Sequence, residues 1–201
     1  LRQFGSVFKD EELRVYVCVI LVSIVLIVLN VRGMYPTLEE TVRHSAFQVG
    51  SIITTTGYST VDFDQWPSFS KTILLLLMVS GACAGSTGGG IKVSRFLIVG
   101  KTVRKEIGSY VHPKSVKKIQ MDGKPIEHEV VRSTNVYFMT YLMLFALLLF
   151  LITFEGLDLV SSFTAVAATF NNIGPGLAAV GPTCSFAGFS LFGKWVLIFA
   201  M

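Results

Sequence analysis

The chain has 201 residues, of which 52% are hydrophobic and 15% are charged, and its mean hydropathy is +0.63. This composition excludes an ordinary soluble globular domain, in which apolar and charged residues are more evenly matched. The net charge of +4 alone would suggest nucleic acid or anionic lipid as a partner, but the positions of the charges favour a membrane protein and no nucleic acid.

Three stretches without a charged residue approach or exceed the roughly 20 residues with which a helix crosses a bilayer. They are residues 15–31, 72–91 and 133–154. The first follows the charged residues 9–14 and lacks a small-residue cleavage site, so we expect a retained anchor. A fourth uncharged stretch, residues 159–193, is interrupted by Gly-Pro pairs, and only seven residues follow Lys194. We therefore expect a truncated last span in a piece of a longer protein.

Residues 41–56 (TVRHSAFQVGSIITTT) follow the first span and are too short to cross the membrane and return as two helices. We predict a short helix that dips into the membrane and returns as extended chain. Non-helical backbone at membrane depth must be enclosed by protein or face a water-filled path. The returning residues, Thr54-Thr55-Thr56-Gly57-Tyr58, are similar to the Thr-Val-Gly-Tyr-Gly filters whose carbonyl oxygens replace the water around a cation.

The residue types of this return suit a weakly hydrated monovalent cation. Glycine permits the backbone angles that direct successive carbonyls the same way. The segment has no carboxylate, whereas calcium and magnesium sites use carboxylates or retained water. An isolated Thr-Thr-Gly-Tyr would more often be a turn or a strand end. Its position at the end of a dip, together with a second copy described below, favours the filter.

The second span changes character halfway along. Residues 72–80 predict a firm helix, but the next ten residues contain five glycines, each of which costs about 1 kcal/mol in a helix interior relative to alanine. We predict a loop that obstructs the path below the filter or moves aside, formed around Gly81, Gly85, Gly88, Gly89 and Gly90. Close helix packing is the alternative. A phosphate-binding loop is disfavoured because Ile91 stands where such a loop has lysine.

A basic segment follows this span. Ten of the 17 Lys and Arg residues lie in it: Lys92, Arg95, Lys101, Arg104, Lys105, Lys114, Lys117, Lys118, Lys124 and Arg132. The positive-inside rule places it in the cytoplasm, where it is an orientation signal or a docking surface. The histidines His44, His112 and His128 have no ligand spacing, and no catalytic set can be assembled, so we predict neither an enzyme nor an organic cofactor.

A second dip lies 117 residues after the first. Residues 158–173 align with residues 41–56 without a gap, so that Ser45 meets Ser162 and Gly57 meets Gly174. An internal duplication is the economical explanation. The second dip ends Asn171-Asn172-Ile173-Gly174, which keeps the glycine and loses the threonines, so we expect a pore of less than fourfold symmetry.

Three motifs in order resemble the Trk, Ktr and HKT superfamily of potassium transporters, and the bacterial TrkH branch most closely. They are residues 50–62 (GSIITTTGYSTVD), 81–92 (GACAGSTGGGIK) and 165–177 (AVAATFNNIGPGL). The resemblance implies an all-α, potassium-channel-like fold of four helix, pore-loop, helix repeats around a central pore. This chain would hold the third and fourth repeats.

The resemblance also implies which residues do what. The potassium-coordinating backbone would be that of Thr55, Thr56, Gly57, Asn172, Ile173 and Gly174, and the glycine loop would be the intramembrane gate. It further implies a homodimer, a cytosolic nucleotide-binding regulatory subunit and a multi-pass location in the bacterial cytoplasmic membrane. The family's last helix carries an arginine that this chain ends too early to include.

These observations together predict potassium uptake through a backbone filter with a glycine-loop gate, with potassium as the transported ligand. We expect one pore repeat in residues 1–110, a basic cytoplasmic linker in residues 111–132, and a second repeat in residues 133–201. Two alternatives stay open: a sodium-permeable or ion-coupled symporter of the same fold, and, from another class, a membrane nucleotide-binding sensor.

Overall fold

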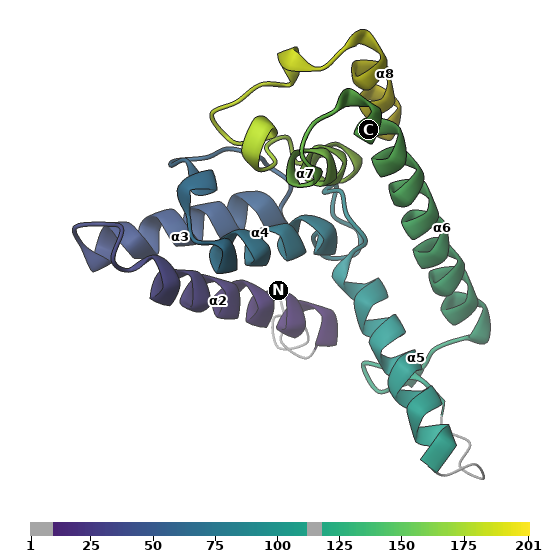
Figure 1. The fold of residues 1–201 in the computed structure, drawn as a ribbon. Helices are drawn as coiled ribbons and strands as arrows, with labels where there is room; N and C mark the ends of the chain where they lie inside the picture. The colour runs from purple at the N-terminus through teal and green to yellow at the C-terminus, as the bar shows by residue number, and fades with distance from the viewer. Residues whose placement is uncertain (1–9, 112–117) are drawn as a thin grey trace.

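The structure, a computed structural model, describes residues 10–111 and 118–201 (Figure 1). Lys9, His112, Lys114 and Lys117, which the sequence analysis singled out, lie outside the described residues. In chain order the α-helices are α2 Glu11–Val31, α3 Leu38–Ile53, α4 Ser68–Ser80, α5 Val93–Val111, α6 His128–Ile152, α7 Leu159–Phe170 and α8 Leu191–Ala200. Short 3-10 helices are η1 Phe63–Gln65, η2 Thr153–Glu155, η3 Ala178–Val180 and η4 Phe186–Gly188.

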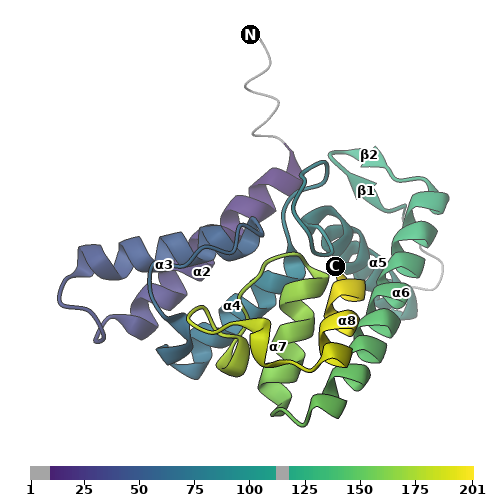
Figure 2. The same cartoon turned by 90° about the horizontal axis from the view of Figure 1, so that it is seen from above.

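The all-α prediction is confirmed. In the described residues the only sheet is a small antiparallel hairpin of β1 Gln120–Met121 and β2 Lys124–Pro125, in which Gln120 pairs with Pro125. Figure 2 shows this hairpin near the N-terminal end of α2, far from it in sequence. The backbone amide of Glu11 donates to Asp122 Oδ1 at 2.8 Å, which ties the two together.

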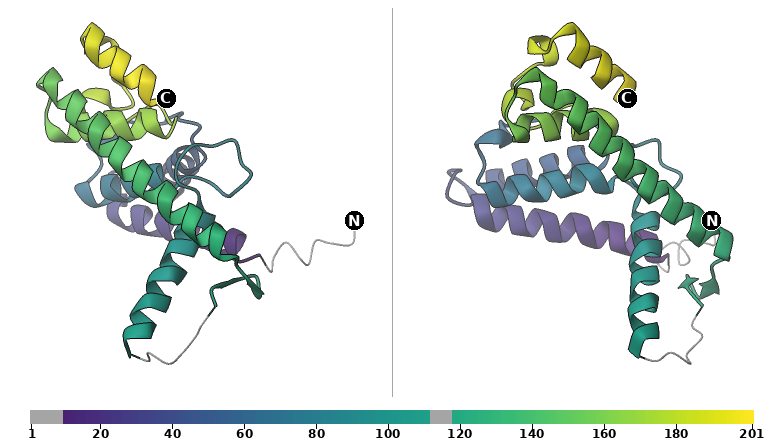
Figure 3. Two further views of the ribbon diagram at one scale, coloured as in Figure 1. Left: turned by 90° about the vertical axis from the view of Figure 1, so that its right-hand side faces the viewer. Right: turned by 45° about the vertical axis from the view of Figure 1, so that its right-hand side comes forward.

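The first helical group consists of α2, α3 and α4, which lie side by side (Figures 1 and 3). Ile27 of α2, Val49 and Ile52 of α3, and Leu74 and Met78 of α4 are fully buried between them. Large apolar side chains recur at helical spacing on each helix, and burying such a stripe is the main stabilising contribution of a packed helix. The short helix predicted as the first dip is α3, which packs against α2 and α4 on one side and exposes Val42 and Phe47 on the other.

The second helical group repeats this arrangement with α6, α7 and α8. Leu148 and Ile152 of α6, Val166 of α7 and Leu197 of α8 form its buried core. Side-chain oxygens cap both dipping helices: Thr37 accepts from the amide of Glu40 at 3.2 Å, and Asp158 accepts from the amide of Ser161 at 3.1 Å. The two predicted dips are therefore both short capped helices.

The second span is interrupted as predicted. Helix α4 ends at Ser80, a loop follows, and α5 begins at Val93 and extends away from the α2–α4 layer (Figures 1 and 3). Gly81, the residue after α4, has φ 66°, a backbone angle that side-chain-bearing residues rarely adopt. The loop therefore separates the apolar helix α4 from the basic helix α5.

Two stretches are long and apolar enough to cross a membrane by length and composition: α2, and His128–Glu155, which is α6 with η2. Within each, only 17% of the most apolar window is buried inside the described structure. Leu29 of α2 and Met143 of α6 are exposed by 66% and 70%. Apolar surface of this extent needs lipid or further protein to cover it.

Candidate ion pathway

The first predicted filter strand, residues 54–58, turns back along the end of α3. All three predicted coordinating residues donate their amide hydrogens to the last turn of that helix. The bonds run from Thr55 to the oxygen of Ile52 at 3.1 Å, from Thr56 to Ser51 at 2.9 Å, and from Gly57 to Ser51 at 3.3 Å. The helix end thus holds Thr55, Thr56 and Gly57 by their amides, while the Ser51 hydroxyl donates to the oxygen of Tyr58 at 2.5 Å.

The second predicted filter strand, residues 171–175, repeats these bonds 117 residues later. The amide of Asn172 donates to the oxygen of Thr169 at 3.0 Å, and those of Ile173 and Gly174 donate to Ala168 at 2.8 and 3.5 Å. Thr55 and Asn172 share a left-handed φ of 56° and 52°. The prediction that the two dips are copies of one structure is confirmed at the level of individual hydrogen bonds.

The carbonyl groups of these residues behave differently from the amides. Within residues 10–111 and 118–201, no hydrogen bond is accepted by the backbone oxygens of Thr55, Thr56, Gly57, Asn172, Ile173 and Gly174. Thr56, Asn172 and Gly174 are exposed in the described structure, Thr55 and Gly57 are half-buried, and Ile173 is buried. At membrane depth an unpaired carbonyl needs protein, water or an ion as its partner. Six backbone oxygens, three in each strand, are therefore available to a ligand.

The two strands approach each other closely. A Cβ built on Gly57, which has φ 79°, would overlap the carbonyl oxygen of Ile173, so only glycine fits there. Gly174 also has a glycine-type φ, of 109°, but no atom lies within 4 Å of a Cβ built on it. Gly57 is therefore the residue that sets the spacing between the strands.

The glycine loop, residues 81–90, connects α4 to α5, and its two ends lie next to each other. Gly81 and Gly90 are so close that a Cβ on either would crowd the backbone of the other. Two bonds close the neck of the loop: Ile91 donates to the oxygen of Val79 at 3.2 Å, and Lys92 donates to that of Ser80 at 3.1 Å. Its ends meet and its chain is compact, as in an Ω-loop.

The C-terminal end of the glycine loop, next to its neck, lies against both strands where they leave α3 and α7. The amide of Gly89 donates to Thr55 Oγ1 at 3.2 Å, and a Cβ on Gly89 would overlap the carbonyl of Asn171. A Cβ on Gly88 would lie 3.1 Å from Thr55 Oγ1. Of the five predicted gate glycines only Gly85 has open space around it. The loop therefore contacts both strands where they leave their helices.

Two residues that hold this region gave no signal in the sequence. Tyr141, in the middle of α6, donates its buried hydroxyl to Asn171 Oδ1 at 2.9 Å. Glu12, in the first turn of α2, accepts from the amide of Ala84 in the loop at 2.6 Å and from that of Ser94 in α5 at 3.1 Å. Their partners are 30, 72 and 82 residues away, beyond the reach of any local pattern.

Other polar side chains have local partners of ordinary kinds. Asp64 pairs with Lys71 at 3.6 Å, and His44 Nδ1 lies 3.0 Å from Thr60 Oγ1. Among the described residues, no three His, Cys, Asp or Glu side chains are grouped as metal ligands. A helix, α4, precedes the glycine loop where a phosphate-binding loop would follow a strand, which weighs against the nucleotide-binding alternative.

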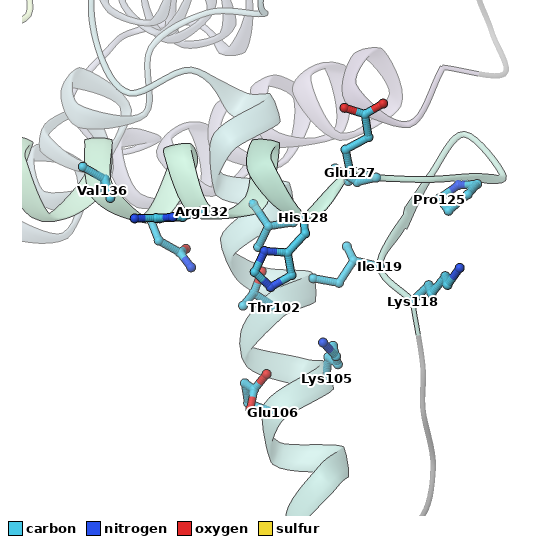
Figure 4. A pocket seen from close by; sticks show the side chains of 13 residues that line it. Thr102, Lys105, Glu106, Lys118, Ile119, Pro125, Glu127, His128, Arg132 and Val136 are labelled. Atoms are coloured by element: carbon cyan, nitrogen blue, oxygen red, sulfur yellow. The ribbon is translucent and has the colours of Figure 1, made fainter.

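The basic segment forms a hollow of about 730 Å³ between the far end of α5 and the start of α6 (Figure 4). Its rim carries Lys105 from α5, Lys118 ahead of β1, and Arg132 from α6, and Figure 4 shows His128 projecting into it. None of these three cations takes part in an ion pair within the described part of the chain. Glu106 and Glu127 line the same hollow, so three cations and two carboxylates face it, away from the predicted filter strands.

Comparisons with known proteins agree with this architecture. A family profile described as "TrkH: Cation transport protein" matches residues 13–201. The chain is 35% identical over 199 residues to the Trk system potassium uptake protein TrkH of Salmonella typhimurium, covering 98% of this chain and 41% of that protein. It is 34% identical over 195 residues to the Trk system potassium uptake protein TrkG of Escherichia coli, covering 96% of this chain and 40% of that protein.

Among solved structures, the chain is similar to the crystal structure of the potassium transporter TrkH from Vibrio parahaemolyticus. The TM-score is 0.89 and the sequence identity 34%, with 99% of this chain and 44% of that chain covered. The chain thus spans about two fifths of the length of the proteins that it matches.

Proposed function

The chain belongs to the TrkH family of cation transport proteins, and from this premise we propose that it forms two pore-loop repeats of a potassium uptake protein. Potassium would move down its electrochemical gradient through a filter made of backbone oxygens. The observation that carries the proposal is the set of unpaired carbonyls at Thr55 to Gly57 and at Asn172 to Gly174. Their amides are all bonded to the helix ends, so the oxygens are left for the ion.

Potassium is the cation that this chemistry favours. The oxygens are uncharged, and divalent ions prefer carboxylates or retained water. The C-terminal ends of α3 and α7 both lead into the strands, and a helix C-terminus carries partial negative charge that attracts a cation. The relatives named above are potassium uptake proteins, which supports the same assignment. Here potassium is the transported ligand and not a resident cofactor.

We propose the glycine loop as the gate. It lies over the ends of both strands through Gly88 and Gly89, and it is held by a few hydrogen bonds and close backbone contacts rather than by a buried core. A segment of this kind opens at low free-energy cost compared with a packed helix. In this role residues 1–110 and 133–201 are the two repeats, and residues 111–132 link them.

The surroundings of the protein follow from the same premise. We place it in the bacterial cytoplasmic membrane as a multi-pass homodimer, with the hollow between α5 and α6 facing the cytoplasm. Unpaired Lys105, Lys118 and Arg132 suit an acidic face of a nucleotide-binding Trk-type regulatory subunit. The chain then transports an ion and catalyses no reaction.

Ion flux tests the proposal. The full-length protein that contains these residues is placed in liposomes, and potassium and sodium uptake are measured for the wild type, Gly57→Ala and Gly33→Ala. Gly57→Ala should lose potassium selectivity because its methyl group would overlap the Ile173 carbonyl, whereas nothing lies within 4 Å of a Cβ on Gly33. Equal potassium and sodium flux in the wild type would favour the sodium-permeable alternative, and no flux of either ion would contradict transport.

A further inference from the structure

The side chain of Lys92 turns back into the glycine loop. Its Nζ donates to the backbone oxygen and to the hydroxyl oxygen of Ser86, each at 3.0 Å, and to the backbone oxygen of Gly88. A lysine ammonium carries three hydrogens and can donate three hydrogen bonds. The loop supplies three oxygens, so the ammonium is fully coordinated by the loop itself.

The backbone of Lys92 is fixed in an unusual conformation. Its φ is 76°, in the left-handed region that a lysine rarely adopts. Strained residues of this kind persist where the surroundings determine them, and they are concentrated at functional sites. The amide of Lys92 closes the neck of the loop through Ser80, so one residue holds both the neck and the interior.

The charge of Lys92 is balanced by neutral oxygens. The ion pairs found among the described residues are Arg43–Glu39, Lys71–Asp64 and Lys101–Glu11, and Lys92 is in none of them. Glu12, the carboxylate bonded to the loop, accepts from two backbone amides. Holding a compact cation with uncharged oxygens is the chemistry of a monovalent-cation site and not of a salt bridge.

We propose that these three oxygens form a monovalent-cation site within the glycine loop, that the Lys92 ammonium is its resident cation, and that this tethered cation holds the loop against the filter. Gly88 connects the cation site to the predicted filter strand, because its oxygen accepts from the ammonium and Gly88 itself lies against the Thr55 hydroxyl. An ion leaving the filter inwards meets this charge and passes when the loop moves aside. The gating role of Lys92 rests on the proposed function, whereas the cation site in the glycine loop does not.

Flux through the full-length protein, without its regulatory subunit, tests the gate. Lys92→Met keeps the length of the side chain and removes the charge. It should raise potassium flux by about tenfold or more, because charge-assisted hydrogen bonds are the stronger ones. Lys92→Arg should give an intermediate flux, since a planar guanidinium does not fit a cage built for a point charge. Ser86→Ala, which removes one oxygen of three, should give a smaller rise.

Lys124→Met is the matched control. Lys124 lies in β2, is exposed, and is outside both the glycine loop and the two predicted filter strands, so losing its ammonium should leave the flux unchanged. Unchanged flux in both Lys92→Met and Ser86→Ala would overturn the proposal.

Thallium(I) binding tests the site without relying on transport. Anomalous scattering from crystals of the full-length protein soaked in thallium(I) should show an ion between Ser86 and Gly88 in Lys92→Met and none there in the wild type. A vacated cage that takes no thallium would overturn the cation site. If the wild-type protein transported no potassium in the flux assay, the proposed function would fail. The thallium(I) experiment would still show whether the cation site exists.

Discussion

The backbone amide of Gly89 donates a hydrogen bond to the side-chain hydroxyl of Thr55 at 3.2 Å, so the glycine loop is bonded directly to the first filter strand. The same glycine lies against the carbonyl of Asn171 in the second strand. One residue of the loop thus touches both predicted filter strands. We expect movement of the loop to change the position of these strands, because the contacts are close.

Removing the Thr55 hydroxyl should loosen the loop. Thr55→Ala deletes the acceptor of the Gly89 amide, which costs about 1 kcal/mol for a typical hydrogen bond and raises the open fraction several-fold. Thr55→Ser keeps the oxygen and should stay close to the wild type. Potassium flux through the full-length protein without its regulatory subunit measures the effect. Equal fluxes in the two variants would mean that this bond does not hold the loop.

The glycine loop should tolerate a methyl group at one glycine and not at another. Gly89→Ala places its methyl group on the Asn171 carbonyl and should displace the loop, whereas a Cβ on Gly85 meets no atom within 4 Å. Gly85 has φ 78°, so Gly85→Ala adds about 1–2 kcal/mol of local strain but no clash.

Thiol modification of Cys83, in a protein whose Cys18 and Cys184 are replaced by Ser, reports the displacement because Cys83 lies within the loop and is half-buried. The modification rate should rise in Gly89→Ala and stay near the wild-type rate in Gly85→Ala. The reverse order would show that backbone strain, and not the contact with the filter, determines where the loop lies.

Tyr141 should act as a positioning residue for the second filter strand. Tyr141→Phe removes the 2.9 Å bond to Asn171 Oδ1 and leaves a buried acceptor unpaired, at a cost of about 1–3 kcal/mol in unfolding free energy. We expect a lower melting temperature together with a lower potassium over sodium selectivity, measured from reversal potentials.

Tyr137→Phe is the matched control for Tyr141→Phe. Tyr137 stacks near Tyr141 on the same helix and under the guanidinium of Arg95, and in the part of the chain that the structure describes its hydroxyl makes no hydrogen bond. A loss of stability without any change in selectivity in Tyr141→Phe would assign the bond to folding alone.

The parts of the fold that the sequence predicted are those set by local chemistry. Uncharged stretches of sufficient length predicted α2 and α6, and the density of glycine predicted the break between α4 and α5. The first dip could be predicted because Thr54 to Gly57 combine small side chains with a glycine at the end of an apolar segment. The alignment at an offset of 117 residues then located the second copy.

The contacts that hold the pathway could not be predicted in the same way. The sequence predicted that Lys92 is the first cation of a cytoplasmic segment. No pattern in the neighbouring residues indicates that this lysine adopts a φ of 76° and that its side chain folds back into the loop. The sequence of the second strand differs from that of the first, because asparagines replace threonines. Its backbone nevertheless makes the same hydrogen bonds as the backbone of the first strand. Side-chain identity is a poor guide where main-chain oxygens form the site.

The cap of α7 should make stability depend on acidic pH. Asp158 accepts hydrogen bonds from the hydroxyl and the amide of Ser161, and these bonds hold the pKa of its carboxyl below the ordinary value. A depressed pKa in the folded state means that the charged form stabilises the fold. That stabilisation is fully present above the unfolded-state pKa, about 3.9, and is lost as the pH falls through the folded-state value.

The melting temperature of the full-length protein, followed from pH 7 down to about pH 3, which is below the ordinary aspartate pKa, tests this dependence. Asp158→Ala should melt lower than the wild type at neutral pH, and the gap should narrow below about pH 4 as the wild-type carboxylate becomes protonated. Asp158→Asn keeps an oxygen for the Ser161 amide but carries no charge, so it should lie between the two at neutral pH. Because every other carboxylate titrates in all three proteins, the difference between their curves isolates Asp158. Parallel curves across the whole range would mean that its charge contributes nothing to the cap.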